Sequence, residues 1–236
     1  MQRYFGQIEA LDDIGEVLMY SRNMCNSKGI LRQSYHFTPI FDEPNSMNTV
    51  VYSDGFSSEW LELYDQSDFR LSDPIPARTM EYGRLLTWKE AMAYAPNSPE
   101  NEAYFAAMRE HGLEHGFGIP LYGPRGRNSY ASFDFGRAIS ADDNASLGMI
   151  RSLSQAGHQR ICVLIDEATS GPELSERETE VMGWIARGKS MSTIATILEL
   201  SPDTVKTYAK RIYAKLGASD RVGATVKALK LGLVHA

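Results

Sequence analysis

The chain has 236 residues, 43% hydrophobic and 23% charged, with a formal net charge of -6. These ordinary values exclude a disordered or collagen-like chain. Only two cysteines occur, Cys25 and Cys162, which excludes a disulfide framework and a four-cysteine zinc site. The first residues lack a basic segment followed by an apolar run, and the apolar run 161–165 is too short to cross a bilayer. We therefore expect no secretory signal, no membrane partner and a cytoplasmic location.

Charge and aromatic content divide the chain into two unequal parts. Residues 1–168 contain 14 basic and 23 acidic residues, whereas residues 169–236 contain 10 basic and 7 acidic residues. Every Phe precedes residue 136. The polar stretch 166–173 between the two parts contains Gly171-Pro172, which is typical of a linker. We expect an N-terminal domain over 1–165 and a C-terminal domain over 174–236, of which only the basic C-terminal one would meet a polyanion.

In chain order, the N-terminal part alternates helical and strand patterns. The expected elements are a helix over about 8–24, strands over 30–38 and 49–54, a helix over 57–66, a short helix after Asp73-Pro74, a helix over 99–111, strands over 116–122 and 129–135 around the turn 123–126, and a long helix over 141–166. Together they predict an α/β/α sandwich with a mostly antiparallel sheet, in an α+β chain.

Helix start and stop signals predict four short helices after residue 174. These signals are a capping box at Ser175-x-x-Glu178, a glycine stop at Gly188, an N-cap followed by proline at Ser201-Pro202, a glycine stop at Gly217 and an N-cap at Ser219 or Asp220. The fourth helix carries three apolar residues, Val222, Val226 and Leu229. Either core packing or dimer contacts would explain them.

The third of these helices separates apolar from basic residues. Its apolar face contains Val205, Ala209, Ile212 and Leu216, and its outer face contains Lys206, Thr207, Lys210 and Arg211. A solvated charged surface would explain the outer face. A short helix and a tight turn precede it, however, and in helix–turn–helix proteins such a helix enters the DNA major groove.

The C-terminal motifs resemble the LuxR-type helix–turn–helix signature. The matching residues are Leu174-Ser175-x-Arg177-Glu178-x-Glu180-Val181, Ala186-x-Gly188-Lys189, Ile194-Ala195, Ser201-x-x-Thr204-Val205-Lys206 and Lys215-Leu216-Gly217. By this resemblance, Lys206 and Lys210 would contact bases, and Thr204 and Arg211 would contact phosphates. Thr207 lies on the same outer face.

Four motifs of the N-terminal part resemble the autoinducer-binding domain of acyl-homoserine-lactone receptors, the quorum-sensing branch of the LuxR family. The motifs are Trp60-x-x-x-Tyr64, Asp73-Pro74, Trp88 and Gly116-x-x-x-Pro120. The resemblance implies that Asp73 accepts from the ligand amide N–H and that the Trp60 indole N–H donates to the lactone carbonyl. A buried amide needs such partners, because an unpaired polar group costs about 1–3 kcal/mol.

The same resemblance implies the other walls of the ligand site. Tyr64 would face the acyl region or its carbonyl, Trp88 would pack on the lactone ring, and the Ser132 hydroxyl would point into the cavity. Phe56 occupies a position where some receptors have a tyrosine that helps to hold the ligand. The remaining lining residues would be Tyr52, Ile75, Tyr104 and Leu113.

Each of these residues also has a purely structural explanation. Asp73-Pro74 is a good N-cap followed by proline at the first helical position. Trp60 and Tyr64 have the spacing of ordinary helix packing, and Ser132 could satisfy a strand backbone group. The ligand site therefore depends on the whole set of residues and on the resemblance.

Other functional classes have little support in the sequence. Asp12-Asp13 and Asp54 suggest a phosphoacceptor receiver, but the spacing around the first pair is helical and the late lysine of a receiver is missing. His111 and His115 have zinc-like spacing, but glycines interrupt the helix they need and no third ligand is evident. No serine or cysteine has the context of a nucleophile. We expect no enzyme activity, no metal and no cofactor.

The resemblance implies a regulator that binds an acyl-homoserine lactone and, as a homodimer, a palindromic operator DNA. RNA polymerase is a further candidate partner. The alternative is an orphan regulator of the same architecture that senses a different small molecule or acts without one.

Overall fold

The computed structural model describes residues 2–39, 42–66, 69–168 and 172–234. The chain separates into two compact units, Met1–Glu167 and Ala168–Ala236. Of the expected linker 166–173, the first three residues belong to a long helix, and residues 169–171 lie outside the described part of the chain.

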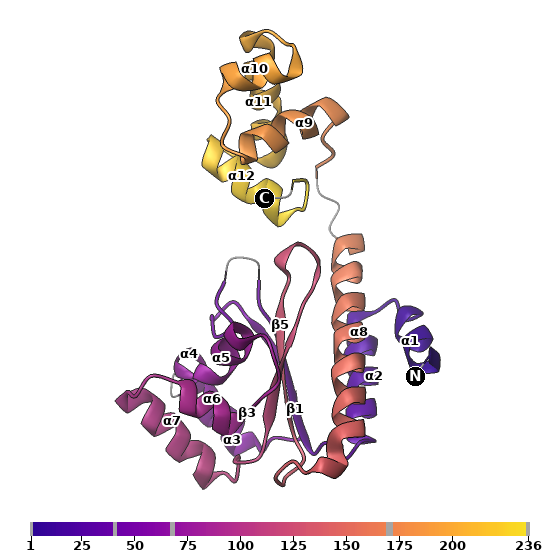
Figure 1. Cartoon of the computed structure of the whole chain (residues 1–236), viewed down its shortest axis with the longest axis vertical. Helices are drawn as coiled ribbons and strands as arrows, with labels where there is room; N and C mark the ends of the chain where they lie inside the picture. The colour runs from indigo at the N-terminus through magenta and orange to yellow at the C-terminus, as the bar shows by residue number, and fades with distance from the viewer. Residues whose placement is uncertain (1, 40–41, 67–68, 169–171, 235–236) are drawn as a thin grey trace. The chain divides into compact units, whose positions relative to one another are not determined.

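The N-terminal unit is built on a five-stranded sheet of order β2-β1-β5-β4-β3 (Figure 1). The strands are β1 (Arg32–Phe37), β2 (Val50–Asp54), β3 (Leu86–Thr87), β4 (Phe117–Leu121) and β5 (Ser129–Asp134). All four strand pairings are antiparallel, which confirms the predicted arrangement. The central strand β5 is buried along its whole length, because both faces of the sheet are covered.

Helices cover both faces of this sheet, and the predicted α/β/α sandwich is confirmed (Figure 1). On one face lie α3 (Ser58–Gln66), α4 (Phe69–Ser72), α5 (Pro74–Tyr82), α6 (Trp88–Tyr94) and α7 (Pro99–Glu110). On the other lie α2 (Ile14–Asn26) and α8 (Asn144–Ala168), with α1 (Gln2–Glu9) beside them.

Two helix boundaries differ from the sequence prediction because of capping. The helix expected over 8–24 is two helices, and α2 begins at Ile14 because Asp13 accepts a hydrogen bond from the Glu16 backbone N–H at 3.0 Å. The long helix α8 follows a short 3-10 turn at Ala141–Asp143 and extends to Ala168. The short elements α4, β3 and α6 were not predicted, since they have too few residues to show a period.

The C-terminal unit contains the four predicted helices: α9 (Glu176–Ala186), α10 (Met191–Leu198), α11 (Pro202–Leu216) and α12 (Arg221–Lys230). The predicted capping box is present between Ser175 and Glu178. The cap of α12 is Asp220, which accepts from the Gly223 N–H at 2.8 Å. Glu178 also accepts from the Lys215 ammonium group at 2.6 Å, so a charge-assisted hydrogen bond links α9 to α11.

Candidate functional site

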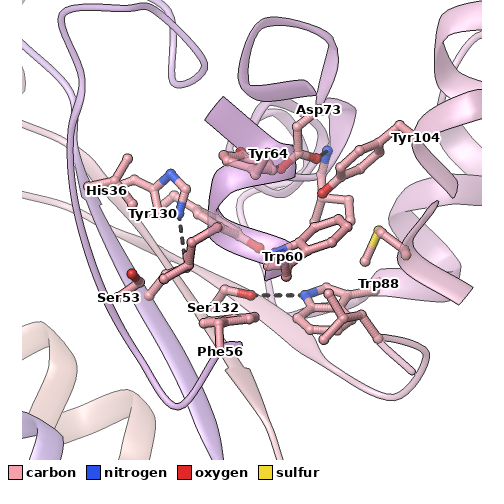
Figure 2. A pocket seen from close by; sticks show the side chains of 16 residues that line it. His36, Ser53, Phe56, Trp60, Tyr64, Asp73, Trp88, Tyr104, Tyr130 and Ser132 are labelled. Carbon is pink, nitrogen blue, oxygen red and sulfur yellow. Dashed lines mark hydrogen bonds between the residues drawn. The ribbon is translucent and has the colours of Figure 1, made fainter. Parts of the chain in front are cut away.

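A cavity of about 60 Å³ lies between the sheet and the helices α3, α5 and α7 (Figure 2). Nine of the ten residues expected to contact a ligand line it. They are Phe56, Trp60, Tyr64, Asp73, Ile75, Trp88, Tyr104, Leu113 and Ser132. The cavity is therefore aromatic, with a few polar groups on its walls, which is typical of a small-molecule site.

Tyr52, the tenth residue, lies on the other side of the sheet. Side chains of a strand alternate between its two faces, and Val51 and Ser53 are the β2 residues that reach the cavity. Tyr52 instead lines a second cavity, of about 40 Å³, together with residues of α2 and α8. This placement corrects the sequence expectation for Tyr52.

Seven further residues of the cavity wall were missed in the sequence. They are Ser34, His36, Val51, Ser53, Leu61, Met108 and Tyr130. Strand alternation could have found some of them, because Tyr130 lies two residues before Ser132 on β5 and His36 lies two residues after Ser34 on β1. Burial and the nearby charge of Arg70 lower the pKa of His36 to about 3, so its imidazole is neutral near pH 7.

Asp73 both caps a helix and lines the cavity. One carboxylate oxygen caps α5 by accepting from the Ile75 N–H at 2.9 Å, and the other accepts from the Tyr64 hydroxyl at 3.0 Å. The residue is 5% exposed and lines the cavity. Burial raises the pKa of Asp73 to about 6, and the hydrogen bonds from Ile75, Tyr64 and Tyr104 offset only part of this increase.

The two tryptophans differ in how their indole N–H groups are used. The Trp88 N–H donates to the Ser132 hydroxyl at 2.9 Å, so that this hydroxyl is held at the cavity wall (Figure 2). The Trp60 ring packs against Tyr64 and Tyr104, with ring centroids 5.9 and 6.2 Å apart. Among the described residues, no acceptor lies within hydrogen-bonding distance of the Trp60 N–H. Trp60 is thus a donor available to a ligand.

Replacing Gly116 with alanine is expected to lower the free energy of unfolding by about 1–3 kcal/mol. A Cβ atom there would lie 2.2 Å from the Trp88 ring, so the ring would have to leave its position on the cavity wall. Thermal denaturation measures the effect. Gly148→Ala in α8 is the control, because a Cβ there meets nothing within 4 Å, and it should leave stability unchanged or slightly raised. Equal melting temperatures for the two variants would contradict this packing.

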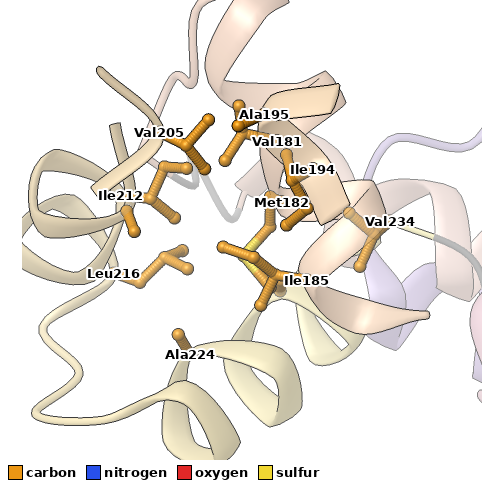
Figure 3. Close-up of a cluster of buried hydrophobic side chains, with 12 residues drawn as sticks. Val181, Met182, Ile185, Ile194, Ala195, Val205, Ile212, Leu216, Ala224 and Val234 are labelled. Carbon is orange, nitrogen blue, oxygen red and sulfur yellow. The ribbon is translucent and has the colours of Figure 1, made fainter. Parts of the chain in front are cut away.

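The C-terminal unit has a compact aliphatic core, to which α11 contributes Val205, Ala209, Ile212 and Leu216 (Figure 3). The predicted apolar face of α11 is buried in full. On the other side, Lys206, Thr207, Lys210 and Arg211 are exposed and Thr204 is half-buried. The apolar and basic faces therefore separate as the sequence predicted.

The outer-face residues differ in how freely their side chains can reach a partner. Thr207 donates to the Asp203 carbonyl at 2.9 Å, and Lys206 forms an exposed ion pair with the Asp203 carboxylate at 3.0 Å. Such pairs contribute about 0–1 kcal/mol and break easily. Lys210 and Arg211 have no hydrogen-bond or ion-pair partner within the described ranges. These cations are available to a polyanion.

Two other features are absent from the described residues. No three metal-ligating side chains come together there, and none of the helices is both long and apolar enough to cross a bilayer. A small-molecule cavity in one unit and a helix–turn–helix with a basic outer face in the other together define a ligand-responsive DNA-binding regulator.

Comparisons with known proteins agree with this class. Two family models match: "Autoinducer binding domain" over residues 14–161 and "Bacterial regulatory proteins, luxR family" over residues 172–228. The chain therefore belongs to the luxR family of bacterial regulatory proteins, and it is a quorum-sensing transcriptional regulator with an autoinducer-binding domain and a DNA-binding domain. The resemblance noted in the sequence is confirmed.

Individual relatives cover nearly the whole chain. The transcriptional activator protein VanR of Vibrio anguillarum is 28% identical over 97% of this chain and 94% of its own length. The quorum sensing-dependent transcriptional regulator RpaR of Rhodopseudomonas palustris is 28% identical over 79% of this chain and 76% of its own. The crystal structure of Escherichia coli SdiA has a TM-score of 0.76 at 22% identity and covers 98% of this chain and 95% of that one. This last likeness shows the shared fold.

Proposed function

We propose that the cavity binds an N-acyl-homoserine lactone and that the chain, as a homodimer, binds a palindromic operator through α11. The observation that carries the proposal is that an unpaired donor and a carboxylate acceptor line the same cavity. The Asp73 carboxylate is a buried acceptor, and the Trp60 indole N–H is a buried donor without a partner among the described residues. A ligand with one amide N–H and one lactone carbonyl satisfies both groups.

The other cavity residues suit the rest of such a ligand. Trp88 offers an apolar wall for the lactone ring, while Tyr64 and Ser132 offer hydroxyls near the acyl carbonyl. The free volume of about 60 Å³ holds only a few water molecules. A lactone must therefore displace water and shift lining side chains, which couples binding to the packing of this unit.

Ligand binding would stabilise the folded sensor by mass action. The gain is RT ln(1+[L]/Kd), or about 3–4 kcal/mol at 100 to 1,000 times Kd. The stabilised sensor would then dimerise and hold two recognition helices about one DNA turn apart. Exposed apolar residues on α8 and α12, namely Val163, Val222 and Val226, support a contact between copies of the chain.

The same proposal assigns the remaining features of the protein. The sensor domain spans 1–165, the linker 166–173 and the DNA-binding domain 174–236. The protein acts in the cytoplasm with RNA polymerase as a further partner, and it has no catalytic role, metal or cofactor. The relatives named above are transcriptional regulators, which supports this assignment.

A second ligand class has one specific observation in its favour. A solved SdiA structure with the same fold, TM-score 0.74 at 23% identity, is a complex with octanoyl-rac-glycerol. The first class, by contrast, is represented by another structure of this fold, Burkholderia cenocepacia CepR2, which is described as N-acylhomoserine lactone dependent and has a TM-score of 0.54 at 16% identity. An acylglycerol hydroxyl could donate to Asp73 in place of the lactone amide.

Thermal denaturation of the purified full-length protein with each ligand class tests the proposal. Lactones should raise the melting temperature in a concentration-dependent way, and the lactone should be recovered by mass spectrometry from protein expressed in its presence. A protein that binds DNA but is stabilised by no lactone would be the orphan regulator, and stabilisation by acylglycerols alone would favour the second class.

Lactone binding should strengthen as the pH rises from about 5 to 7. The Asp73 pKa of about 6 exceeds the value of about 3.9 in an unfolded chain. Between these two pH values the ligand-free folded state binds more protons than the unfolded chain. The contribution of Asp73 to the free energy of unfolding therefore falls as the pH rises, and the loss is complete above pH 6. An amide N–H favours the carboxylate, so ligand binding lowers the pKa and affinity should rise up to about tenfold.

Calorimetry at several pH values, in buffers of different ionisation enthalpy, measures both the affinity and the proton released. Burial lowers the pKa of His36 to about 3 and that of His158 to about 4, so neither imidazole titrates in this window. Asp73→Asn should abolish the pH dependence. A flat affinity profile for the unaltered protein would show that the ligand does not contact the ionised carboxylate.

A further inference from the structure

Tyr130 lies on the floor of the cavity, which is the wall formed by the sheet, although the sequence did not assign it to the site. It lies on β5, on the same face as Ser132, and is 2% exposed. The strand register places it directly opposite His36 on β1, and the two rings meet edge to face at 5.1 Å between centroids (Figure 2). Cross-strand aromatic pairs of this kind hold each other in place.

A glycine on the neighbouring strand gives the Tyr130 ring its space. Gly118 on β4 pairs with Ser132, and a Cβ atom on Gly118 would lie 2.3 Å from the Tyr130 ring and 2.8 Å from its hydroxyl. The ring therefore leans over the strand onto a position that has no side chain. The phenol thus extends from its contact with His36 toward Ser132, the residue that lies opposite Gly118.

Tyr130 and His36 lie in one row across the sheet that ends at Val51 on β2, and the neighbouring row on the same face contains Ser132, Ser34 and Ser53. The Ser34 hydroxyl and the His36 imidazole nitrogen Nε2 lie 2.9 Å apart and are hydrogen-bonded to each other. The phenol of Tyr130 occupies the space above its row, so a long alkyl chain there would have to displace the ring. A short acyl group avoids this cost.

We propose that Tyr130, whose ring lies over Gly118 and packs against His36, restricts the ligand to lactones with a short acyl group. This inference rests on the proposed function and names the part of the lactone class that the cavity takes. Side-chain volume at residue 130 then sets the longest chain accepted, while Asp73 and Trp60 hold the common head group.

Calorimetric titration of the full-length protein with butanoyl-, hexanoyl- and dodecanoyl-homoserine lactone tests this inference. The unaltered protein should bind the butanoyl or hexanoyl compound at least about tenfold more tightly than the dodecanoyl one. Tyr130→Ala, or Tyr130→Val as the better strand former, should reverse the order. Each methylene that becomes buried raises the affinity about fourfold. Burial of two further methylenes in the variant would therefore raise the affinity for the dodecanoyl compound more than about tenfold.

Two control variants separate ring volume from other effects. Tyr130→Phe keeps the ring and removes only the hydroxyl, so the preference for short chains should persist. Tyr52→Ala removes a tyrosine from the opposite face of the same sheet and should also leave the order of the three ligands unchanged. Circular dichroism establishes that each variant is folded.

Two results would overturn the inference while leaving lactone binding intact. The first is equal or tighter binding of the dodecanoyl compound by the unaltered protein, which decides the matter even where both Tyr130 substitutions fail to fold. The second is a folded Tyr130→Ala or Tyr130→Val variant that retains the preference for short chains. Binding of none of the three lactones would overturn the proposed function itself, and this inference with it.

Discussion

Replacing Asp73 with asparagine is expected to reduce lactone affinity by about 10- to 150-fold, because a hydrogen bond to a charged group contributes about 1.5–3 kcal/mol. Asparagine keeps an oxygen that can accept from the Ile75 N–H, and it is as good an N-cap as aspartate. The start of α5 should therefore persist while the charged acceptor is lost. Calorimetry gives the affinity, and the ligand-dependent shift in melting temperature gives an independent measure.

A second buried aspartate provides the matched control for this experiment. Asp143 accepts a hydrogen bond from the backbone N–H of the N-cap residue Ser140 at 2.8 Å and pairs with Arg137 at 2.7 Å, and it does not line the cavity. Asp143→Asn should change stability but not lactone affinity. An Asp73→Asn protein with an unchanged ligand-dependent shift would remove Asp73 from the binding site and leave it only its capping role.

Substitutions on α11 are expected to separate base recognition from phosphate binding. Lys206→Ala should weaken binding to the preferred operator by about 1–3 kcal/mol while changing binding to random DNA much less. Arg211→Ala should weaken binding to all DNA and reduce the slope of log affinity against log salt by about one. Fluorescence anisotropy over a range of salt concentrations, with an operator selected from a random pool, measures both effects.

Lys227→Ala on α12 is the charge-matched control for these variants. Its ammonium group donates to the Gly217 carbonyl within its own unit, so its loss should weaken DNA binding less than the loss of Arg211. If Lys206→Ala loses equal affinity for operator and random DNA, Lys206 contacts phosphate and not a base. Unchanged DNA binding in both α11 variants would place the DNA interface elsewhere.

Local signals in the sequence were enough to predict most helices and the two faces of α11. Caps such as Ser175 with Glu178 act within one turn, so they can be recognised without the rest of the fold. The two-residue strand β3 was missed because it exists only through its pairing with β4, where Leu86 lies opposite Gly118. Long-range pairing of this kind leaves no local pattern.

The composition of the cavity was harder to predict than its existence. Tyr52 was assigned to the wrong face because neither face of β2 is fully buried, so its sequence does not show which residues point inward. Tyr130 was missed for the opposite reason. All residues of β5 are buried, and a strand covered on both faces loses the alternation that marks one of them.

The position of Asp73, at the start of a helix and on the cavity wall, limits which substitutions the protein can accept there during evolution. A carboxylate that both begins α5 and lines the cavity can be exchanged only for the few residues that cap helices well. His36, Ser53 and Tyr130 also border the cavity, but none of them begins a helix. Divergence toward a new signal molecule should therefore start at the floor of the cavity, while Asp73, the proposed partner of the ligand amide, stays the same.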